Sequence, residues 1–241
     1  MNHQELSQIK PNDKKFGLLI DPENYNNDQL VKTIKKANKA GVDYLFLGGS
    51  LLSKSIEPSA RIIKENTTLP LILFPGNLMQ ISEDADGILL LSLISGRNPD
   101  LLIGNHFLAA KRLKASKLEV IPTGYILIEG GNTSAVEYIS NTKPIPAEHT
   151  DIIVSTAIAG ELLGHKMIYL ESGSGASNSL DSITIKEVKN HITIPLIVGG
   201  GLKEPSDIKR VSNAGANIVI VGNAIEENPD KLNVMVDALK K

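Results

Sequence analysis

The sequence predicts an α/β protein built as a single (β/α)₈ barrel, and three observations lead to this fold class. Short aliphatic runs bounded by glycine or proline recur eight times in 241 residues, as doubly covered parallel strands do. Stretches of helical periodicity separate most of them. The last two runs end in glycines, where barrels of the TIM type commonly hold a phosphate. We expect one domain over residues 1–241, with residues 1–14 as an N-terminal extension.

The expected strands are rich in valine, isoleucine and leucine, which must supply nearly all of the core because the chain has no tryptophan and few aromatics. In chain order they cover residues 16–20, 44–47, 71–74, 88–91, 119–122, 167–170, 196–198 and 218–221.

Helical stretches fill the gaps between these runs. Residues 30–37 and 208–214 carry apolar residues at helical spacing, and each stretch is followed by a glycine suited to end a helix, Gly41 and Gly215. Pro205 is placed as a first helical residue. Residues 98–116 also predict a helix.

Two regions depart from this alternation of strands and helices. Residues 53–68 contain Pro58 and predict only a small second helix. After the fifth strand, residues 125–131 add an extended segment and residues 143–146 a proline-rich turn, before a helix over residues 149–163. An elaborated region is therefore expected there. An open doubly wound sheet is the alternative to the barrel.

Composition narrows the classes of function. The net charge of −2 leaves no basic stripe, which argues against a nucleic-acid partner. The chain has no cysteine, so disulfides, thiolate catalysis and Cys-ligated metals are excluded, and any metal must be bound by oxygen. We assign no ligand role to the five histidines. No apolar run is long enough for a transmembrane segment, and we expect a cytoplasmic protein.

Glycine-rich strand ends predict a phosphate site. Residues 199–201 are all glycine and Gly222-Asn223 follows the eighth run, each shortly before a helix begins. Without a Cβ the backbone approaches an anion closely, so main-chain N–H groups and helix dipoles converge on phosphate oxygens. Gly173-Ser174-Gly175, after the sixth run, adds further donors.

Asp21 and Ser50 are candidates for a metal site, because they follow the first and second strands. Neighbouring parallel strands lie about 5 Å apart. A carboxylate and a hydroxyl could therefore share one Mg²⁺, which also takes water and substrate phosphate oxygens. The alternative is that Asp21-Pro22 is an ordinary helix-start signal.

Glu171 follows the sixth strand and is a candidate catalytic base, or an acceptor that holds a substrate hydroxyl. A salt-bridged glutamate at the barrel rim is the alternative.

Taken together, these strand ends resemble the geranylgeranylglyceryl phosphate synthase family over nearly the whole chain. The most specific element is YLESGSG, residues 169–175. The others are LIDPE (19–23), LGGS (47–50), FPG (74–76), the triple glycine 199–201 and Gly222-Asn223.

The resemblance implies a Mg²⁺-dependent prenyltransferase of ether phospholipid biosynthesis, which joins sn-glycerol 1-phosphate to a polyprenyl diphosphate. It implies that Asp21 and Ser50 bind the metal. It implies a homo-oligomer, dimer or hexamer, and a twenty-carbon donor. On glycerol phosphate it places Tyr169, Leu170, Glu171, Ser172, Gly173, Ser174, Gly175, Gly200, Gly201, Gly222 and Asn223.

Two departures from the family pattern bear on phosphate affinity and subfamily. Leu19 stands where some relatives have lysine. The basic residue after the triple glycine is Lys203 in this chain, where the family pattern has arginine.

Two other functions remain open at this point. A sugar-phosphate or amino-acid-pathway isomerase would use the same phosphate site, with Asp21 and Glu171 as its acid and base. A non-catalytic phospho-ligand binder would give Asp21 no reason to hold a metal.

Overall fold

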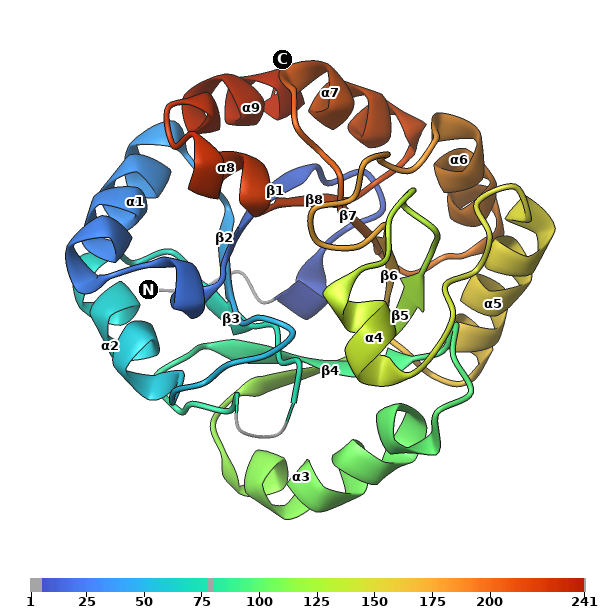
Figure 1. Ribbon diagram of the computed structural model, residues 1–241, viewed down its shortest axis with the longest axis horizontal. Helices are drawn as coiled ribbons and strands as arrows, with labels where there is room; N and C mark the ends of the chain where they lie inside the picture. Colours follow the sequence, from blue (N-terminus) through green and yellow to red (C-terminus); the bar gives the residue numbers. More distant parts are fainter. Residues whose placement is uncertain (1–5, 78–79, 241) are drawn as a thin grey trace.

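The computed structural model describes residues 6–77 and 80–240, in which the strands form one closed parallel barrel (Figure 1). Each strand pairs in parallel with the next along the chain, and β8 returns to β1. The strands are β1 (Lys15–Ile20), β2 (Tyr44–Leu47), β3 (Leu71–Leu73), β4 (Gly87–Leu93), β5 (Glu119–Leu127), β6 (Met167–Glu171), β7 (Leu196–Gly199) and β8 (Ile218–Val221). The predicted (β/α)₈ barrel is confirmed, and the open sheet is excluded.

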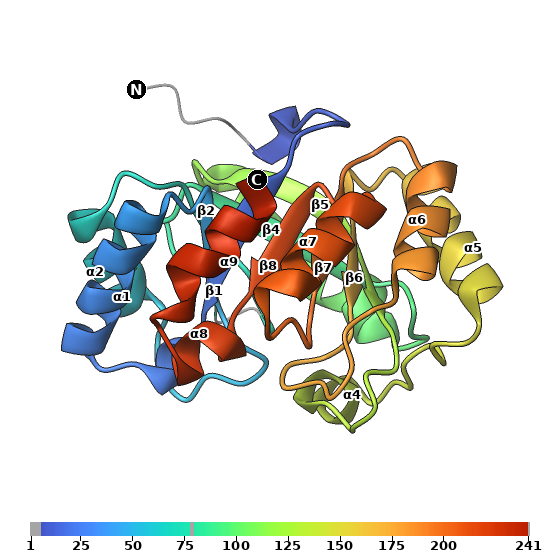
Figure 2. The same ribbon diagram turned by 90° about the horizontal axis from the view of Figure 1, so that it is seen from above.

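Helices surround the barrel. The outer ring is α1 (Asn27–Ala40), α2 (Glu57–Asn66), α3 (Asn105–Ala115), α5 (Thr150–Leu162), α6 (Ser182–His191), α7 (Pro205–Ala214) and α9 (Lys231–Lys240). Two short helices, α4 (Ala135–Ser140) and α8 (Asn223–Glu227), lie at the carboxyl ends of the strands, on the face opposite the N-terminal segment (Figure 2). Short 3₁₀ turns cover Leu6–Gln8 and Pro22–Asn24.

Local chemistry explains where the helices begin and end. Asn26 caps α1 through a hydrogen bond from the Gln29 backbone, and the Gln29 side chain returns the bond, as in a capping box. Gly41 ends α1 with a φ of 75°, a left-handed conformation that favours glycine. The expected helix over residues 208–214 is confirmed as part of α7, which begins at Pro205.

Alternate residues of each strand enter two separate cores. In β2, Leu45 and Leu47 join the layer between strands and helices, whereas Tyr44 and Phe46 fill the barrel interior. Most strand residues of both layers are buried, which explains why the strands appear in the sequence as continuous apolar runs.

The region after the fifth strand is more elaborate than a regular β/α unit, as expected, and the connection after the fourth strand is irregular as well. β5 runs to Leu127 and includes part of the predicted extended segment, and Ile128 then bridges to Ile145. The helix predicted over residues 98–116 begins with a π-helical turn, Asp100–Gly104, before α3. In Figure 1, α3 lies farther from the barrel centre than the other helices of the ring.

The described part of the predicted N-terminal extension closes the bottom of the barrel. Leu6 and Ile9 are buried against the interior aromatic residues of β2. Asn217, which precedes β8 and is fully buried, donates from its side chain to the carbonyls of Lys10 (3.3 Å), Pro11 (2.7 Å) and Asp13 (3.2 Å). Residues 6–14 therefore belong to the folded domain.

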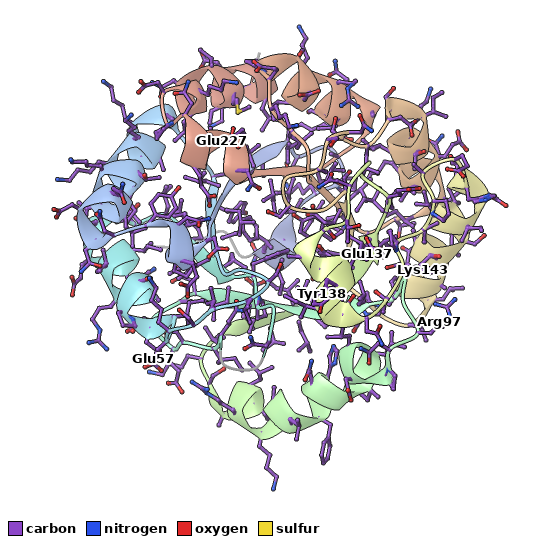
Figure 3. The ribbon with its side chains drawn as sticks, viewed as in Figure 1. Glu57, Arg97, Glu137, Tyr138, Lys143 and Glu227 are labelled. Carbon is purple, nitrogen blue, oxygen red and sulfur yellow. The ribbon has the colours of Figure 1, made fainter. Side chains whose placement is uncertain are left out.

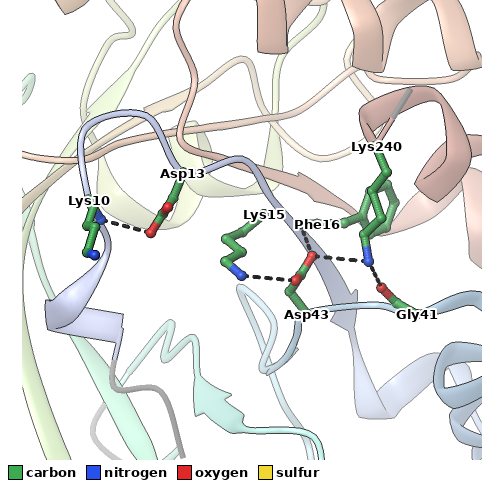
Figure 4. A network of polar contacts seen from close by, with 7 residues as sticks. All are labelled: Lys10, Asp13, Lys15, Phe16, Gly41, Asp43 and Lys240. Carbon is green, nitrogen blue, oxygen red and sulfur yellow. Dashed lines mark hydrogen bonds and ion pairs between the residues drawn. The ribbon is translucent and has the colours of Figure 1, made fainter.

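A polar network at this same end joins the two ends of the chain (Figure 4). Asp43 accepts hydrogen bonds from the Phe16 backbone at 2.9 Å and from Lys15 Nζ at 3.3 Å. Lys240, in α9, donates to the carbonyl of Gly41 and forms an ion pair with Asp43 at 3.9 Å. The opposite end is left for the functional site.

Candidate functional site

A polar pocket of about 180 Å³ occupies the carboxyl end of the barrel. Most predicted site residues line it because the strand ends meet there. Those lining it are Asp21, Ser50, Tyr169, Glu171, Ser174, Gly175, Gly200, Gly201, Gly222 and Asn223.

Glu171 lies in the wall of this pocket with a carboxyl group that is almost entirely buried. Its Oε1 accepts a hydrogen bond from the Gly173 backbone at 2.7 Å, and the Tyr169 hydroxyl also donates to it. Burial raises the pKa of the Glu171 carboxyl to about 7, although both hydrogen bonds act in the opposite direction. Near neutral pH this group is suited to accept a proton.

The triple glycine makes room for that carboxyl group. A Cβ on Gly199 would lie 2.3 Å from the Tyr169 hydroxyl, and one on Gly200 would lie 2.3 Å from Glu171 Oε1. Gly200 and Gly201 also have positive φ angles of 84° and 65°. These glycines therefore serve the packing of Glu171, and without a Cβ they also leave the backbone open to a close approach by an anion.

The loops after β6 and β8 meet across the pocket. The Ser174 hydroxyl donates to Asn223 Oδ1 at 3.0 Å. Gly222 precedes α8, so the first turn of that helix forms part of the pocket lining. Lys203 is another lining residue and brings a positive charge. This half of the pocket combines backbone, hydroxyl and cationic groups, which are typical of phosphate sites.

Asp21 and Ser50 lie on the opposite side of the pocket. Asp21 Oδ1 accepts a hydrogen bond from the Glu23 backbone at 3.0 Å, as at a helix N-terminus. Its Oδ2 faces the β2–α2 loop, where a Cβ on Gly49 would lie 2.5 Å from it. The carboxylate thus contacts the loop that contains Ser50. Burial raises the pKa of the Asp21 carboxyl above its ordinary value.

Three of the predicted glycerol phosphate residues do not line the pocket. The Leu170 side chain is buried in the core between strands and helices. Ser172 is buried, and its hydroxyl has no hydrogen-bond partner among the described residues. Gly173 acts through its backbone, which donates to Glu171.

Two polar residues that the sequence analysis did not identify form hydrogen bonds with the backbone around Asp21 and Ser50. Glu226, in α8, accepts from the Asp21 backbone at 3.4 Å and from the Asn24 amide at 2.9 Å. Gln80 is fully buried and exchanges two hydrogen bonds with the backbone of Gly49. The sequence could have indicated only Glu226, because it lies three residues after Asn223 and therefore close to a predicted site residue.

An apolar groove of about 700 Å³ adjoins the polar pocket. It runs between α3, α4 and β4, and leucines and isoleucines supply much of its lining. His106 also lines it, with Nε2 2.9 Å from the Ser92 hydroxyl, and burial lowers the pKa of its imidazole. The groove and the pocket share Gly49, Ser50, Phe74, Tyr125 and Val136.

Aromatic rings form the junction between the two cavities. The Phe74 ring lies 6.2 Å from Tyr125 and 5.4 Å from Tyr169, and the two tyrosine rings are 5.2 Å apart. The arrangement offers one polar and one apolar ligand a common meeting point. Residues 9–241 match the model of the PcrB family.

The chain belongs to the PcrB family. Two relatives are called geranylgeranylglyceryl phosphate synthase. The one from Zunongwangia profunda is 47% identical over 94% of this chain and 97% of its own. The one from Chitinophaga pinensis is 44% identical over 94% and 90%. The expected family relationship is confirmed.

A solved structure gives this PcrB family member a close structural counterpart. The (S)-3-O-geranylgeranylglyceryl phosphate synthase of Thermoplasma acidophilum, in complex with its substrate sn-glycerol-1-phosphate, superposes with a TM-score of 0.90 at 30% identity. The match covers 95% of this chain and 94% of the other.

Proposed function

We propose that the protein is a prenyltransferase that forms an ether bond between sn-glycerol 1-phosphate and a polyprenyl diphosphate, with geranylgeranyl diphosphate as the expected donor. The observation that carries this proposal is the pair of adjoining cavities. A polar pocket of about 180 Å³ fits a small phosphate ester, and an apolar groove of about 700 Å³ fits a hydrocarbon chain. A sugar-phosphate isomerase or a phospho-ligand binder would leave the groove without a use.

In the proposed reaction the allylic C–O bond of the donor breaks, and its electron pair leaves with diphosphate. The glycerol hydroxyl oxygen forms the new ether bond and gives its proton to the Glu171 carboxylate. Because the electrophile has cationic character, Glu171 acts more by holding the hydroxyl in place than by its basicity. The burial of Glu171 would limit the access of water to the reacting hydroxyl.

The phosphate of the acceptor is assigned to the backbone of Gly200, Gly201 and Gly222, with Ser174 and Asn223 beside it. This side of the pocket offers backbone and side-chain donors. Tyr169, with its hydroxyl on Glu171, is expected to orient the glycerol end.

Mg²⁺ is proposed at Asp21 and Ser50, whose carboxylate and hydroxyl oxygens are suitable ligands. Asp21 and Glu226 bring two carboxyl groups to this side of the pocket. Burial raises the pKa of each, and a bound cation would act in the opposite direction by favouring the charged forms. The described residues hold no cluster of three or more His, Cys, Asp or Glu that could bind a metal, so water and diphosphate would complete the coordination. The ion would stabilise the charge of the departing diphosphate.

A homo-oligomer is also proposed, with α5 and α6 as the contact surface. Apolar residues occur on every side of α5, a pattern typical of buried helices. Leu162, Leu163 and Ile183 are nevertheless exposed. Light scattering after size exclusion should show more than one chain per particle, and a Leu162→Ser/Leu163→Ser variant should shift the particle towards the monomer. A wild-type monomer would refute the proposal.

The function is tested by incubating the protein with sn-glycerol 1-phosphate, radiolabelled geranylgeranyl diphosphate and Mg²⁺, and then extracting with organic solvent after phosphatase treatment. A labelled prenylglycerol in the organic phase is expected. Asp21→Ala should abolish most of the product and the response to Mg²⁺. Absence of product with donors of several chain lengths would exclude the transferase.

A further inference from the structure

Large apolar side chains are exposed around the opening of the groove. Phe107 and Leu108 in α3 are 76% and 67% exposed, and both line the groove. Ile103, one turn earlier, is also exposed. On the facing wall, α4 exposes Tyr138 and Ile139, and Figure 3 shows Tyr138 between the barrel centre and α3. Exposed apolar residues thus border the groove on both sides.

Positive charge accompanies this apolar border. Lys111 and Lys114 follow Phe107 by one and two turns of α3, and both are exposed. Within the described residues, neither lysine side chain makes a hydrogen bond or an ion pair. Residues 97–117 hold one carboxylate, Asp100, against five cations: Arg97, Lys111, Arg112, Lys114 and Lys117. The whole chain, in contrast, has a net charge of −2.

Some of these cations are already engaged within the protein. Arg112 donates to the carbonyl of Ile81 at 2.9 Å and lies 3.8 Å from Glu57. Arg97 donates to the carbonyl of Gly96 at 2.7 Å. Lys117 is exposed but lies beyond the end of α3. Lys111 and Lys114 are therefore the cations of α3 that face solvent beside the exposed apolar residues, and an external anionic surface is the partner that would complement them.

A second copy of this chain is a poor occupant for this surface. In a twofold contact each residue of a patch meets residues of the same patch. Both copies of Lys111 and Lys114 would then enter one shared interface, which is unfavourable for like charges. The exposed apolar residues of α5 and α6 form a separate patch without this conflict.

We propose that the groove rim, defined as Ile103, Phe107, Leu108, Tyr138 and Ile139 with Lys111 and Lys114, docks on the surface of an anionic lipid bilayer. An amphipathic helix with aromatic and aliphatic residues beside lysines lies in a membrane interface, with the apolar side chains between the lipid headgroups. Lysines close to the surface add attraction to anionic lipids. The described residues include no helix that could cross a bilayer, so the contact is peripheral.

Such docking would place the open side of the groove against the acyl chains. A long prenyl chain could then move between bilayer and groove without exposure to water. This use of the surface rests on the proposed function, whereas the docking itself rests on the rim and its charges.

The test is flotation of the full-length protein with large unilamellar vesicles, without either substrate. We expect binding to equimolar phosphatidylglycerol and phosphatidylcholine, at least tenfold weaker binding to phosphatidylcholine alone, and a marked loss at 0.5 M salt. Phe107→Ser/Leu108→Ser should weaken binding to the anionic vesicles about tenfold. Lys111→Glu/Lys114→Glu should remove the preference for phosphatidylglycerol.

Matched substitutions elsewhere control for general effects of polarity and charge. Val234→Ser in α9 removes an exposed apolar residue, and Lys32→Glu/Lys35→Glu in α1 reverses two exposed lysines. Both should bind like the wild type. Wild-type protein that stays unbound, or rim variants that bind like the controls, would overturn the proposal. If the wild type stays unbound and light scattering shows that Phe107→Ser forms a smaller particle than the wild type, the rim is instead an interface between copies of the chain. Vesicle binding needs no catalysis, so its failure is distinct from failure of the proposed reaction.

Discussion

At the scale of single residues, Glu171 depends on glycines that follow another strand. Its carboxyl group is buried, and its pKa is raised to about 7 because solvent is excluded. The space for it exists because Gly199 and Gly200 have no side chain. A strand end that the sequence indicates as a phosphate loop therefore also determines where the proposed base can lie.

The rate should depend on pH through the ionisation of Glu171. A raised pKa means that the carboxylate, the form that accepts a proton, is lost as the pH falls through about 7. We expect kcat to rise between pH 6 and pH 8 and then level off. Glu171→Gln should lower kcat by about 10²-fold and flatten this part of the profile. A variant that kept the wild-type pH dependence would show that another group is responsible.

Gly200→Ala should disturb both the backbone and Glu171. The new Cβ would clash with the carboxyl group, and the φ of 84° is unfavourable for alanine. We expect at least a tenfold loss of kcat/KM and a loss of about 2–3 kcal/mol in the free energy of unfolding.

Gly164→Ala is the matched control for this substitution. Gly164 also has a positive φ, 94°, but a Cβ there would meet nothing within 4 Å, and the residue lies outside the pocket. It should lose only about 1 kcal/mol of stability and keep full activity. Equal loss of activity in both variants would contradict the assigned role of Gly200.

At the scale of elements, one buried side chain holds the N-terminal segment on the barrel. Asn217 donates to carbonyls of residues 10–13, while its Oδ1 accepts from the Leu196 backbone at 3.0 Å and from Lys189 at 2.9 Å. Both halves of the amide are used. The segment, β7 and α6 therefore meet at one residue just before β8.

Asn217→Ala should destabilise the fold without affecting chemistry. It leaves a buried N–H and several carbonyls without partners, at a cost of about 2–4 kcal/mol. For a chain of this length that corresponds to a fall in Tm of roughly 5–12 °C. Asn213→Ala, at an exposed position in α7, should leave Tm within about 2 °C of the wild type. Calorimetry decides, and an unchanged Tm for Asn217→Ala would contradict this role.

The elements also show what sequence periodicity could predict. All eight strands were predicted because fully buried parallel strands read as unbroken aliphatic runs, and Gly41 and Gly215 marked true helix ends. The π-helical turn Asp100–Gly104 was not predicted, since its residues suit an ordinary helix. Residues 1–14 were expected to form an N-terminal extension, whereas residues 6–14 pack on the barrel. Local sequence does not reveal this, because the burial of Leu6 depends on the open end of a closed barrel.

At the scale of the whole molecule, the barrel brings together strand ends that are far apart in the sequence. Asp21, Ser50, Glu171, Gly200 and Asn223 line one pocket, as their positions after successive strands indicated. The roles of Glu226 and Gln80 depend on side-chain directions across neighbouring loops, which no spacing encodes. The groove exists because of the position of α3 relative to β4. Side-chain packing sets that position, so the sequence pattern does not predict the groove.

The same arrangement would let one surface bind the two chemically different ligands of the proposed reaction. The groove and the pocket meet at Ser50, Phe74 and Tyr125, so a hydrocarbon chain and a phosphate ester would approach each other without sharing a binding site. The glycine-rich strand ends alone indicate only a phosphate site. The apolar groove beside it favours prenyl transfer over the other chemistries of this barrel.

A crystal structure of the protein with sn-glycerol 1-phosphate and a non-reactive thiolodiphosphate analogue of geranylgeranyl diphosphate would test this two-ligand site most directly. We predict the acceptor phosphate against Gly200, Gly201 and Gly222, its terminal hydroxyl at Glu171, and the prenyl chain in the groove beside α3. A prenyl chain bound elsewhere, or a glycerol hydroxyl remote from Glu171, would contradict the assignment.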